Sequence, residues 1–409
     1  MSGDHTHGHG PREPLNRLLL FAVVPFAIAT LVGLVLLWPG KVARNEVFGQ
    51  RVELHNGTVT DLSVRPCLGA EDGPARCVTI TVKLAEGPEK GQRVDVEIGE
   101  GPGAPTVDDG DPVVLGRNAD PTGTVTYYFA DFQRKAPLLV LALIFAVVVV
   151  LLGRWRGLAA LGALAVSLLV IVKFVLPALL EGSSPLAVAV VGSAAIMFLA
   201  LYLTHGVNAQ TTTAVLGTLT SLAVTGVLGS VFVAASRFTG LASEEAGFLQ
   251  SAAGQVDLQG LLLAGIVIGS LGVLDDVTVT QASAVWQLHR ANPALPARDL
   301  YRSGLHIGRD HIASTVNTLV LAYAGASLPL LLLFTLAQQP AGAVLTGEVV
   351  AAEVVRTLVG SIGLVASVPI TTALAAVVVA RTRPEAVEPA APSWAPPAAE
   401  REFWADEPE

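Results

Sequence analysis

Long runs of apolar residues, separated by short polar stretches, dominate the chain. The first run covers residues 17–38, and seven more follow residue 135. These seven lie at 136–153, 158–180, 185–204, 212–236, 261–280, 313–336 and 359–380. A helix needs about 20 apolar residues to cross the hydrocarbon core, because each residue adds only about 1.5 Å. The pattern therefore predicts an all-α polytopic membrane domain of about eight transmembrane helices.

Residues 40–133, between the first and second runs, have a different pattern. Stretches such as CVTITVKL and RVDVEI alternate apolar and polar residues, and Gly, Pro and Asp turns separate them. Period-two alternation in short stretches is typical of half-buried strands. We therefore expect a small all-β barrel or sandwich inserted between the first and second helices. The run at 17–38 is longer than the apolar core of a signal peptide, about 7–15 residues, so we interpret it as a retained anchor.

The two ends of the chain are polar. Residues 1–16 carry His5, His7 and His9, and residues 381–409 are rich in Pro, Ala and Glu. Segments of this composition cannot bury enough apolar surface to fold, so we expect both to be disordered. The seven-helix membrane domain is then expected over 136–380, and we expect no metal site at the histidines.

Composition supports the membrane class and argues against nucleic acid as a partner. The chain is 52% hydrophobic and 14% charged, whereas soluble domains carry about a quarter charged residues. The lipid bilayer is therefore an expected partner. Net charge is −9, and the sequence has no basic stripe of the kind that neutralises phosphates.

The distribution of arginine in the short loops predicts the orientation. With the N-terminus inside, the inner segments hold Arg12, Arg17, Arg154, Arg156, Arg290, Arg298, Arg302, Arg309, Arg381 and Arg383. The outer short loops hold only Arg237 and Arg356. This asymmetry follows the positive-inside rule. We expect a protein of the plasma membrane with both termini cytoplasmic and the β-rich insert outside.

Cys67 and Cys77 are the only cysteines, and both lie in the insert. Two cysteines ten residues apart in an outward-facing segment suggest one disulfide bond. Two free thiols remain the alternative.

Small and polar residues recur on one face of the run at 261–280. Gly265, Gly269, Gly272, Asp276 and Thr280 are spaced by four, three, four and four residues. At about 100° per residue they share one side of a helix, whereas Asp275 points elsewhere. The glycines allow another backbone to approach closely, and a carboxylate at this depth usually faces protein or water. We therefore expect Asp276 to point at a close-packed neighbour or a cleft. The alternative is a helix-end aspartate wetted by cytoplasmic water.

Two further polar groups lie on the inner side under this topology, and they are candidates for the same pathway. Asp310, Ser314 and Asn317 stand at i, i+4 and i+7, and Asn208 follows the run at 185–204. Ser314, Asn317 and Asn208 are the expected neighbours of Asp276. A structural role, as helix-packing or helix-end groups, is the alternative for each.

Two charged features lie further toward the outside. Lys173 lies about 22 Å from the inner end of its run, where its side chain is expected to reach the outer interface or, alternatively, to form a gate. Glu353 and Arg356 stand at i, i+3 and are expected to pair.

Enzyme motifs are missing from the sequence. It has no G-x-S-x-G, H-E-x-x-H or G-x-x-x-x-G-K-[ST] pattern. We therefore expect neither catalysis nor a bound cofactor.

Three segments resemble signature blocks of the YibE/F-like membrane proteins: IGSLGVLDDVTVTQASAV, SGLHIGRDHIASTVNTLVLAYAGASLPLLLLF and EVVRTLVGSIGLVASVPITT. The resemblance covers roughly 135–380. Its G-x-L-G-x-x-x-D pattern falls on Gly269 to Asp276 and implies a role for that aspartate. Asp275 departs from the pattern, which usually has an apolar residue there. The resemblance implies a transporter-like membrane fold with no settled biochemical role.

Three functions compete on this evidence. A secondary transporter or channel for an unknown small solute or ion is favoured by the glycine-rich packing and isolated polar residues. A sensor or assembly factor would instead use the outer β-domain to bind a protein partner. An intramembrane enzyme is the third candidate, and a homo-oligomer is compatible with each.

Overall fold

The computed structural model describes residues 17–40, 53–66, 76–99, 103–119, 124–252, 254, 256–336, 338 and 340–381. The chain forms two compact units, which are described separately: Ala43–Leu161, and Met1–Val42 together with Gly162–Glu409. The expected disordered ends and Cys67 lie outside the described residues, so the disulfide stays a prediction.

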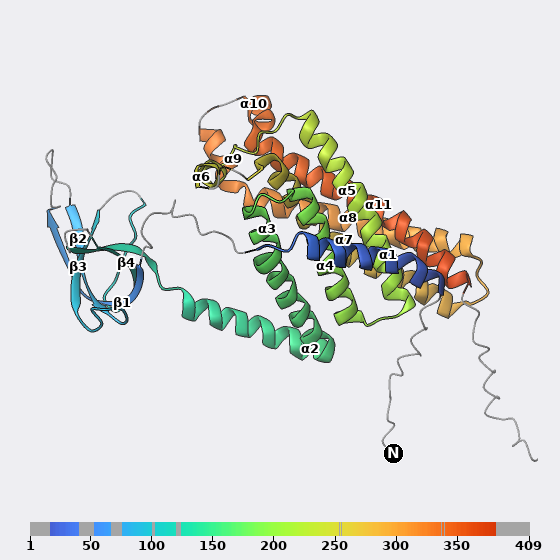
Figure 1. Ribbon diagram of the computed structural model, residues 1–409, viewed down its shortest axis with the longest axis horizontal. Helices are drawn as coiled ribbons and strands as arrows, with labels where there is room; N and C mark the ends of the chain where they lie inside the picture. Colours follow the sequence, from blue (N-terminus) through green and yellow to red (C-terminus); the bar gives the residue numbers. More distant parts are fainter. Residues whose placement is uncertain are drawn as a thin grey trace, which may run out of the picture. The chain divides into compact units, whose positions relative to one another are not determined.

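The first unit contains a five-stranded antiparallel sheet (Figure 1). Its strands are β1 (Glu53–Pro66), β2 (Arg76–Leu84), β3 (Arg93–Gly99), β4 (Pro112–Ala119) and β5 (Val125–Phe132). They are ordered β3-β2-β1-β4-β5, and the outer strands β3 and β5 approach each other. This is the neighbour order of the five-stranded OB-fold barrel. The predicted small β-domain is therefore confirmed, and its sheet is barrel-like.

Alternation along the strands builds the barrel core. In β3, Val96 and Ile98 are buried, whereas Asp95 and Glu97 between and beside them are exposed. Val59, Val82 and Leu115 from three other strands join the same core. Side chains of a strand alternate between its faces, so this pattern fixes which face is inside.

The second unit is helical. The helices, including the part of α2 that lies in the first unit, are α1 (Arg17–Leu36), α2 (Lys135–Val170), the π-helical turn η2 (Ile171–Val175), α3 (Leu176–Leu180), α4 (Pro185–His205), α5 (Ala209–Ala235), α6 (Glu244–Ala252), α7 (Leu258–Ala291), α8 (Ala297–Ala326), α9 (Leu328–Leu336), α10 (Ala341–Thr346) and α11 (Glu348–Arg381). Within the described residues, six helices are long and apolar enough to cross a membrane, or seven if the bent pair α8 and α9 counts as one span.

The sequence predicts eight spans, one more than the count of seven, and the difference lies in one segment. The segment Lys135–Leu180 counts as one span of 46 residues, although about 20 residues suffice to cross the hydrocarbon core. Arg154 has φ 52° and ψ −130°, which breaks the helix between the two predicted runs 136–153 and 158–180. The sequence count of eight treats this segment as two spans and stays a prediction.

α5, α7 and α11 lie side by side and form the centre of the membrane unit, with α4 and α8 packed against α7 (Figure 1). Small residues bring these helices together. A Cβ at Gly217 would collide with Thr371, and one at Gly363 would collide with Thr225. Close approach through glycine is the usual packing mode in membranes, where apolar surface alone gives helices little reason to associate.

α7 and α8 are longer than the apolar runs that predicted them. The stretch 281–312 looks like a long inner loop in the sequence, but α7 continues to Ala291 and α8 begins at Ala297. The apolar run marks only the part of a helix in contact with hydrocarbon, whereas the helix itself ends at Asn292, just before Pro293. At 34 residues, α7 is about 51 Å long and extends beyond a core of about 30 Å.

Candidate functional site

The glycine face of α7, defined as Gly265, Gly269, Gly272, Asp276 and Thr280, is exposed along its whole length. The residues between them, such as Ile266 and Leu274, are buried against α4, α5 and α11. The helical spacing therefore does place these five residues on one side. The other described helices leave that side uncovered.

Side chains from α8 and α11 approach the half of the glycine face nearer the start of α7. This half is called outer, and the other half inner, after the orientation predicted from the arginines. A Cβ on Gly265 would lie 3.8 Å from Arg356 Nη2, and one on Gly269 would lie 3.4 Å from Tyr323 Oη. Arg356 Nη1 also donates a hydrogen bond to Glu353 Oε1 at 2.6 Å, so the expected pair is present. The glycines leave room for a guanidinium and a phenol beside the backbone.

The inner half of the face is open. A Cβ on Gly272 would meet nothing within 4 Å. Asp276 is exposed, and within the described residues its carboxylate has no hydrogen bond or ion pair. The expected close-packed neighbour of Asp276 is therefore not found among the described residues. A repeat of glycines fixes which residues share a side of the helix, but not what stands opposite that side.

Two hollows lie at the ends of this face. The outer hollow, about 300 Å³, is bounded by α8, α9, α10 and α11, and Tyr323 and Glu353 belong to its wall. The inner hollow, about 500 Å³, lies between α7 and α8 and is lined by Thr280, Ser283 and Gln287 among others. Tyr323 touches both the outer hollow and the glycine face, and Thr280 belongs to both the face and the inner hollow. An exposed strip of glycines and polar residues, roughly 17 Å from Gly269 to Thr280, therefore lies between the two hollows.

Asp275, the neighbour of Asp276, is the more deeply placed carboxylate. It lies about 100° around α7 from Asp276 and is half-buried. Its Oδ1 is inaccessible to solvent and has no hydrogen-bond partner among the described residues. An unpaired buried carboxylate oxygen is costly, so Asp275 is a second candidate for chemistry on this helix.

The polar stripe of α8 points away from the bundle. Leu305, Ile312 and Val316 pack into the core beside α7 and α11. Asp310, Ser314 and Asn317 lie roughly 140–160° around the helix from Ile312 and are exposed. No hydrogen bond joins Ser314 or Asn317 to Asp276 among the residues that the structure describes.

Asn208 has a structural role in this arrangement. Its side chain accepts a hydrogen bond from Thr211 N at 2.9 Å and caps the start of α5. Its Nδ2 donates to the carbonyls of His205 and Gly206. These contacts occupy both ends of the amide, so Asn208 is not available to Asp276.

Lys173 lies in the π-helical turn η2 and is exposed. No ion pair is found for it within the described parts of the chain. Its neighbours Phe174 and Val175 are buried, so the turn directs the lysine outward while its flanks pack inward. The position agrees with a side chain that reaches for the interface.

The profile of the YibE/F-like protein family matches residues 141–381, more than half of the chain. The chain belongs to the YibE/F-like family. Neither a curated protein nor a solved structure matches it. The glycine face, both hollows and the Glu353–Arg356 pair of this YibE/F-like protein all lie within the matched residues, whereas the barrel lies outside them.

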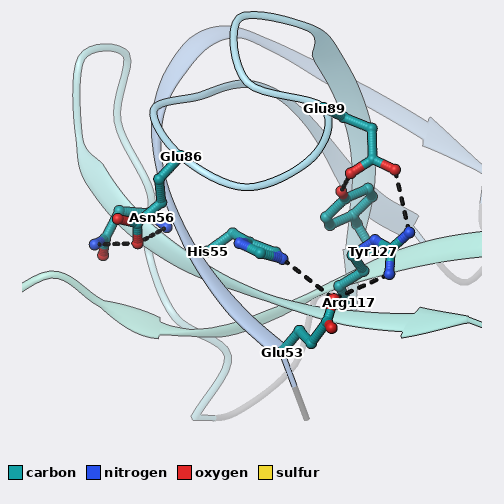
Figure 2. A network of polar contacts seen from close by, with 7 residues as sticks. All are labelled: Glu53, His55, Asn56, Glu86, Glu89, Arg117 and Tyr127. Carbon is teal, nitrogen blue, oxygen red and sulfur yellow. Dashed lines mark hydrogen bonds and ion pairs between the residues drawn. The ribbon is translucent and has the colours of Figure 1, made fainter. Parts of the chain in front are cut away.

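The barrel of this YibE/F-like protein carries a polar network of its own (Figure 2). Glu53 pairs with Arg117 across β1 and β4, and Arg117 pairs with Tyr127 across β4 and β5. Arg117 Nη1 donates to Glu53 Oε2 at 3.0 Å, and its Nη2 donates to Glu89 Oε1 at 3.2 Å. Tyr127 Oη donates to Glu89 Oε2 at 2.7 Å. One guanidinium therefore joins the start of β1 to the turn between β2 and β3.

The same turn is held at a second point. Glu86 accepts hydrogen bonds from Asn56 N and Asn56 Nδ2 (Figure 2). The neighbouring Gly87 lies against the ring of His55. Gly87 has φ 95°, and a Cβ there would come 2.6 Å from His55 Nδ1. Only glycine fits this close approach with that backbone conformation.

Hydrogen bonding sets the protonation of the network. The hydrogen bond from Tyr127, and then the bond from Arg117, hold the pKa of Glu89 below its ordinary value of 4.5. Burial, and then the hydrogen bond to Glu89, raise the pKa of Tyr127 above 10.0. Near neutral pH the network is a carboxylate–guanidinium–carboxylate chain with a neutral phenol, which suits a structural clamp.

Proposed function

We propose that this protein is a secondary transporter or channel, and that a small solute or ion passes along the glycine face of α7. The observation that carries the proposal is the exposed strip of glycines and polar residues between the outer hollow and the inner hollow. Gly272 and Asp276 lie in its middle, and the described residues leave both uncovered. Unsatisfied polar groups at membrane depth are usually tolerated where they line a water-filled cavity.

The side chains along the strip have different roles in this proposal. Glycine removes side chains from the wall, so a solute can approach the backbone of α7. Tyr323, Thr280 and Ser283 supply hydroxyl groups that can replace part of a hydration shell. Asp276 supplies the carboxylate of the glycine face, and among the described residues it has no partner that a solute would have to displace.

The proposed setting is the plasma membrane, with both termini cytoplasmic and the barrel outside. The arginine distribution supports this orientation. The outer hollow would then open toward the outside and the inner hollow toward the cytoplasm.

Cysteine accessibility tests the proposal without knowledge of the solute. In a Cys67→Ser, Cys77→Ser background, we expect Gly272→Cys to react with 2-(trimethylammonium)ethyl methanethiosulfonate in membranes open on both sides. Gly272 has free space for the new side chain. Val227→Cys on α5 is the matched control. Val227 is 65% exposed, and the adjacent Gly226 approaches Val267 of α7, which places this exposed position at the level of that α7 residue. A pathway predicts modification of Gly272→Cys alone, and protection of both positions would refute it.

A sensor or assembly factor is the second candidate, and the same uncovered face favours it. Exposed glycines at four-residue spacing can take the helix of a partner or of a second copy. In that case a partner helix would protect Gly272→Cys in native membranes. Reactivity that appears only after detergent extraction would support this candidate over transport.

A further inference from the structure

We propose that the outer hollow is a binding site for a small organic monocation, such as an alkylammonium ion. This inference deepens the proposed function by naming a solute class. The role of the site in transport rests on the proposed function, whereas binding at the site does not. The hollow lies where α8 ends and α9 turns away by 59°, next to the first turns of α11. Broken helices of this kind often frame solute sites in secondary transporters.

Most of the wall is apolar. Val320, Leu331, Leu345, Val354 and Leu358 contribute to it from four helices. The volume of about 300 Å³ is at the small end of the range for ligand pockets. A strongly hydrated inorganic ion would lose its water here without replacement, whereas alkyl groups would gain contacts with these side chains.

The polar groups of the wall favour a positive charge. Glu353 Oε1 accepts from Arg356, but within the described residues its Oε2 has no hydrogen-bond partner. Arg356 extends toward Gly265 and is not part of the wall, whereas Glu353 is, so the hollow lies on the glutamate side of this pair. Thr357 Oγ1 donates its proton to the carbonyl of Glu353 at 2.8 Å, so toward any other group it can only accept.

A further feature points the same way. Tyr323 belongs to the wall, and aromatic faces attract alkylammonium groups. A glutamate and an aromatic residue therefore border an apolar space, which suits an organic cation.

Tyr323 connects this site to the strip. Its ring lies in the wall of the hollow, and its Oη lies beside Gly269. A cation held at Glu353 is therefore positioned at the outer end of the glycine face, with Asp276 as the next carboxylate along it.

Equilibrium binding of tetraethylammonium chloride to the full chain in nanodiscs tests the inference. By calorimetry against NaCl of equal ionic strength, we expect saturable binding to the wild type. Glu353→Gln should weaken it at least about tenfold, which corresponds to about 1.4 kcal/mol. Glu245→Gln, an equal charge change on exposed α6, should leave it unchanged.

Because Glu353→Gln leaves Arg356 unpaired, a second variant is used to distinguish loss of the binding site from misfolding. Ala324→Phe fills the hollow while keeping the carboxylate, and it should also abolish binding with an unchanged melting temperature. Absence of binding to the wild type, or equal binding to Glu353→Gln, overturns the inference. Because binding is measured without flux, that result leaves the transport proposal standing. Binding to the wild type with Gly272→Cys protected would instead refute transport and keep the site.

Discussion

Gln281 of α7 donates a hydrogen bond from Nε2 to the backbone carbonyl of Gly304 in α8, 2.6 Å away. The same Nε2 donates to Thr372 Oγ1 of α11 at 2.8 Å. A Cβ on Gly308 would come 2.8 Å from Gln281 Oε1, so α8 can approach only because glycine stands there. A single buried amide therefore joins three helices at the level of the inner hollow.

Gln281→Leu should lower the free energy of unfolding by about 1–3 kcal/mol, because it removes two buried hydrogen bonds while keeping similar bulk. Thermal unfolding in detergent measures the change. Gln287→Leu is the control and should be close to neutral, since Gln287 is exposed and, among the described residues, bonds only to Ser283. Equal effects of the two substitutions would show that the buried amide does not hold the helices together.

The clamp in the barrel predicts a dependence of local stability on pH. The folded-state pKa of Glu89 lies below its ordinary value of 4.5, so its contribution is present above that value and is lost as the pH falls through the folded pKa. We expect β4 and β5 to lose protection against hydrogen exchange as the pH falls below about 4.5, after correction for intrinsic rates.

Glu89→Gln provides the matched test of that prediction. It should reduce protection at neutral pH and flatten the response to acid in the full chain. Glu97→Gln on the exposed side of β3 should behave as the wild type. A steep acid response that survives Glu89→Gln would assign it to another group.

The predicted orientation is testable by labelling from one side. Ser184→Cys, before α4, should react with an impermeant maleimide in intact cells that lack the native cysteines. Trp155→Cys should stay unmodified until the cells are opened. Trp155 is 82% exposed beside the break at Arg154, whereas a side chain at Gly157 would collide with the carbonyl of Val149. The reverse labelling pattern would invert the orientation.

Asp276→Asn should reduce uptake of labelled tetraethylammonium into proteoliposomes at least about tenfold, a barrier change of about 1.4 kcal/mol. Because Asp276 is exposed and unpaired, the melting temperature should hardly change. Asp310→Asn, on the face of α8 that points away from the bundle, should leave both quantities unchanged. A loss of stability with a proportional loss of uptake would indicate a structural role for Asp276, and no change in either would end its functional assignment.

The sequence predicts local periodicity well and long-range neighbours poorly. Alternation in CVTITVKL and RVDVEI gives β2 and β3, and the apolar runs give the spans of α4, α5 and α11, because each depends on residues close in the chain. Gly265 to Thr280 share a face for the same reason. Whether a face is covered depends on residues far away, which is why the exposure of Asp276 and of the Asp310 stripe was not predictable.

Other residues of the site were missed in the sequence for the same reason. In the sequence, Tyr323 is one aromatic residue within an apolar run. Only the packing of α8 on α7 brings it to Gly269. Glu353 and Arg356 were recognisable as an i, i+3 pair, but not as the boundary between a hollow and the glycine face. Arg117 and Glu89 meet across 28 residues of sequence, and no local pattern marks them. The resemblance implies an apolar residue at position 275, and this departure is the sequence signal that marks Asp275.

Two glycines in the middle of membrane helices should respond in opposite ways to the same substitution. At Gly363 of α11, a Cβ would collide with Thr225 Oγ1 of α5, so Gly363→Ala must push two central helices apart. Overpacking of this kind costs about 1–3 kcal/mol. At Gly272 of α7, a Cβ meets nothing within 4 Å, and alanine is a better helix former than glycine by up to about 1 kcal/mol. Gly272→Ala should therefore raise the melting temperature slightly, whereas Gly363→Ala should lower it. If Gly272→Ala is instead as damaging as Gly363→Ala, a second copy or a partner helix packs on the glycine face, and the strip is an interface and not a pathway.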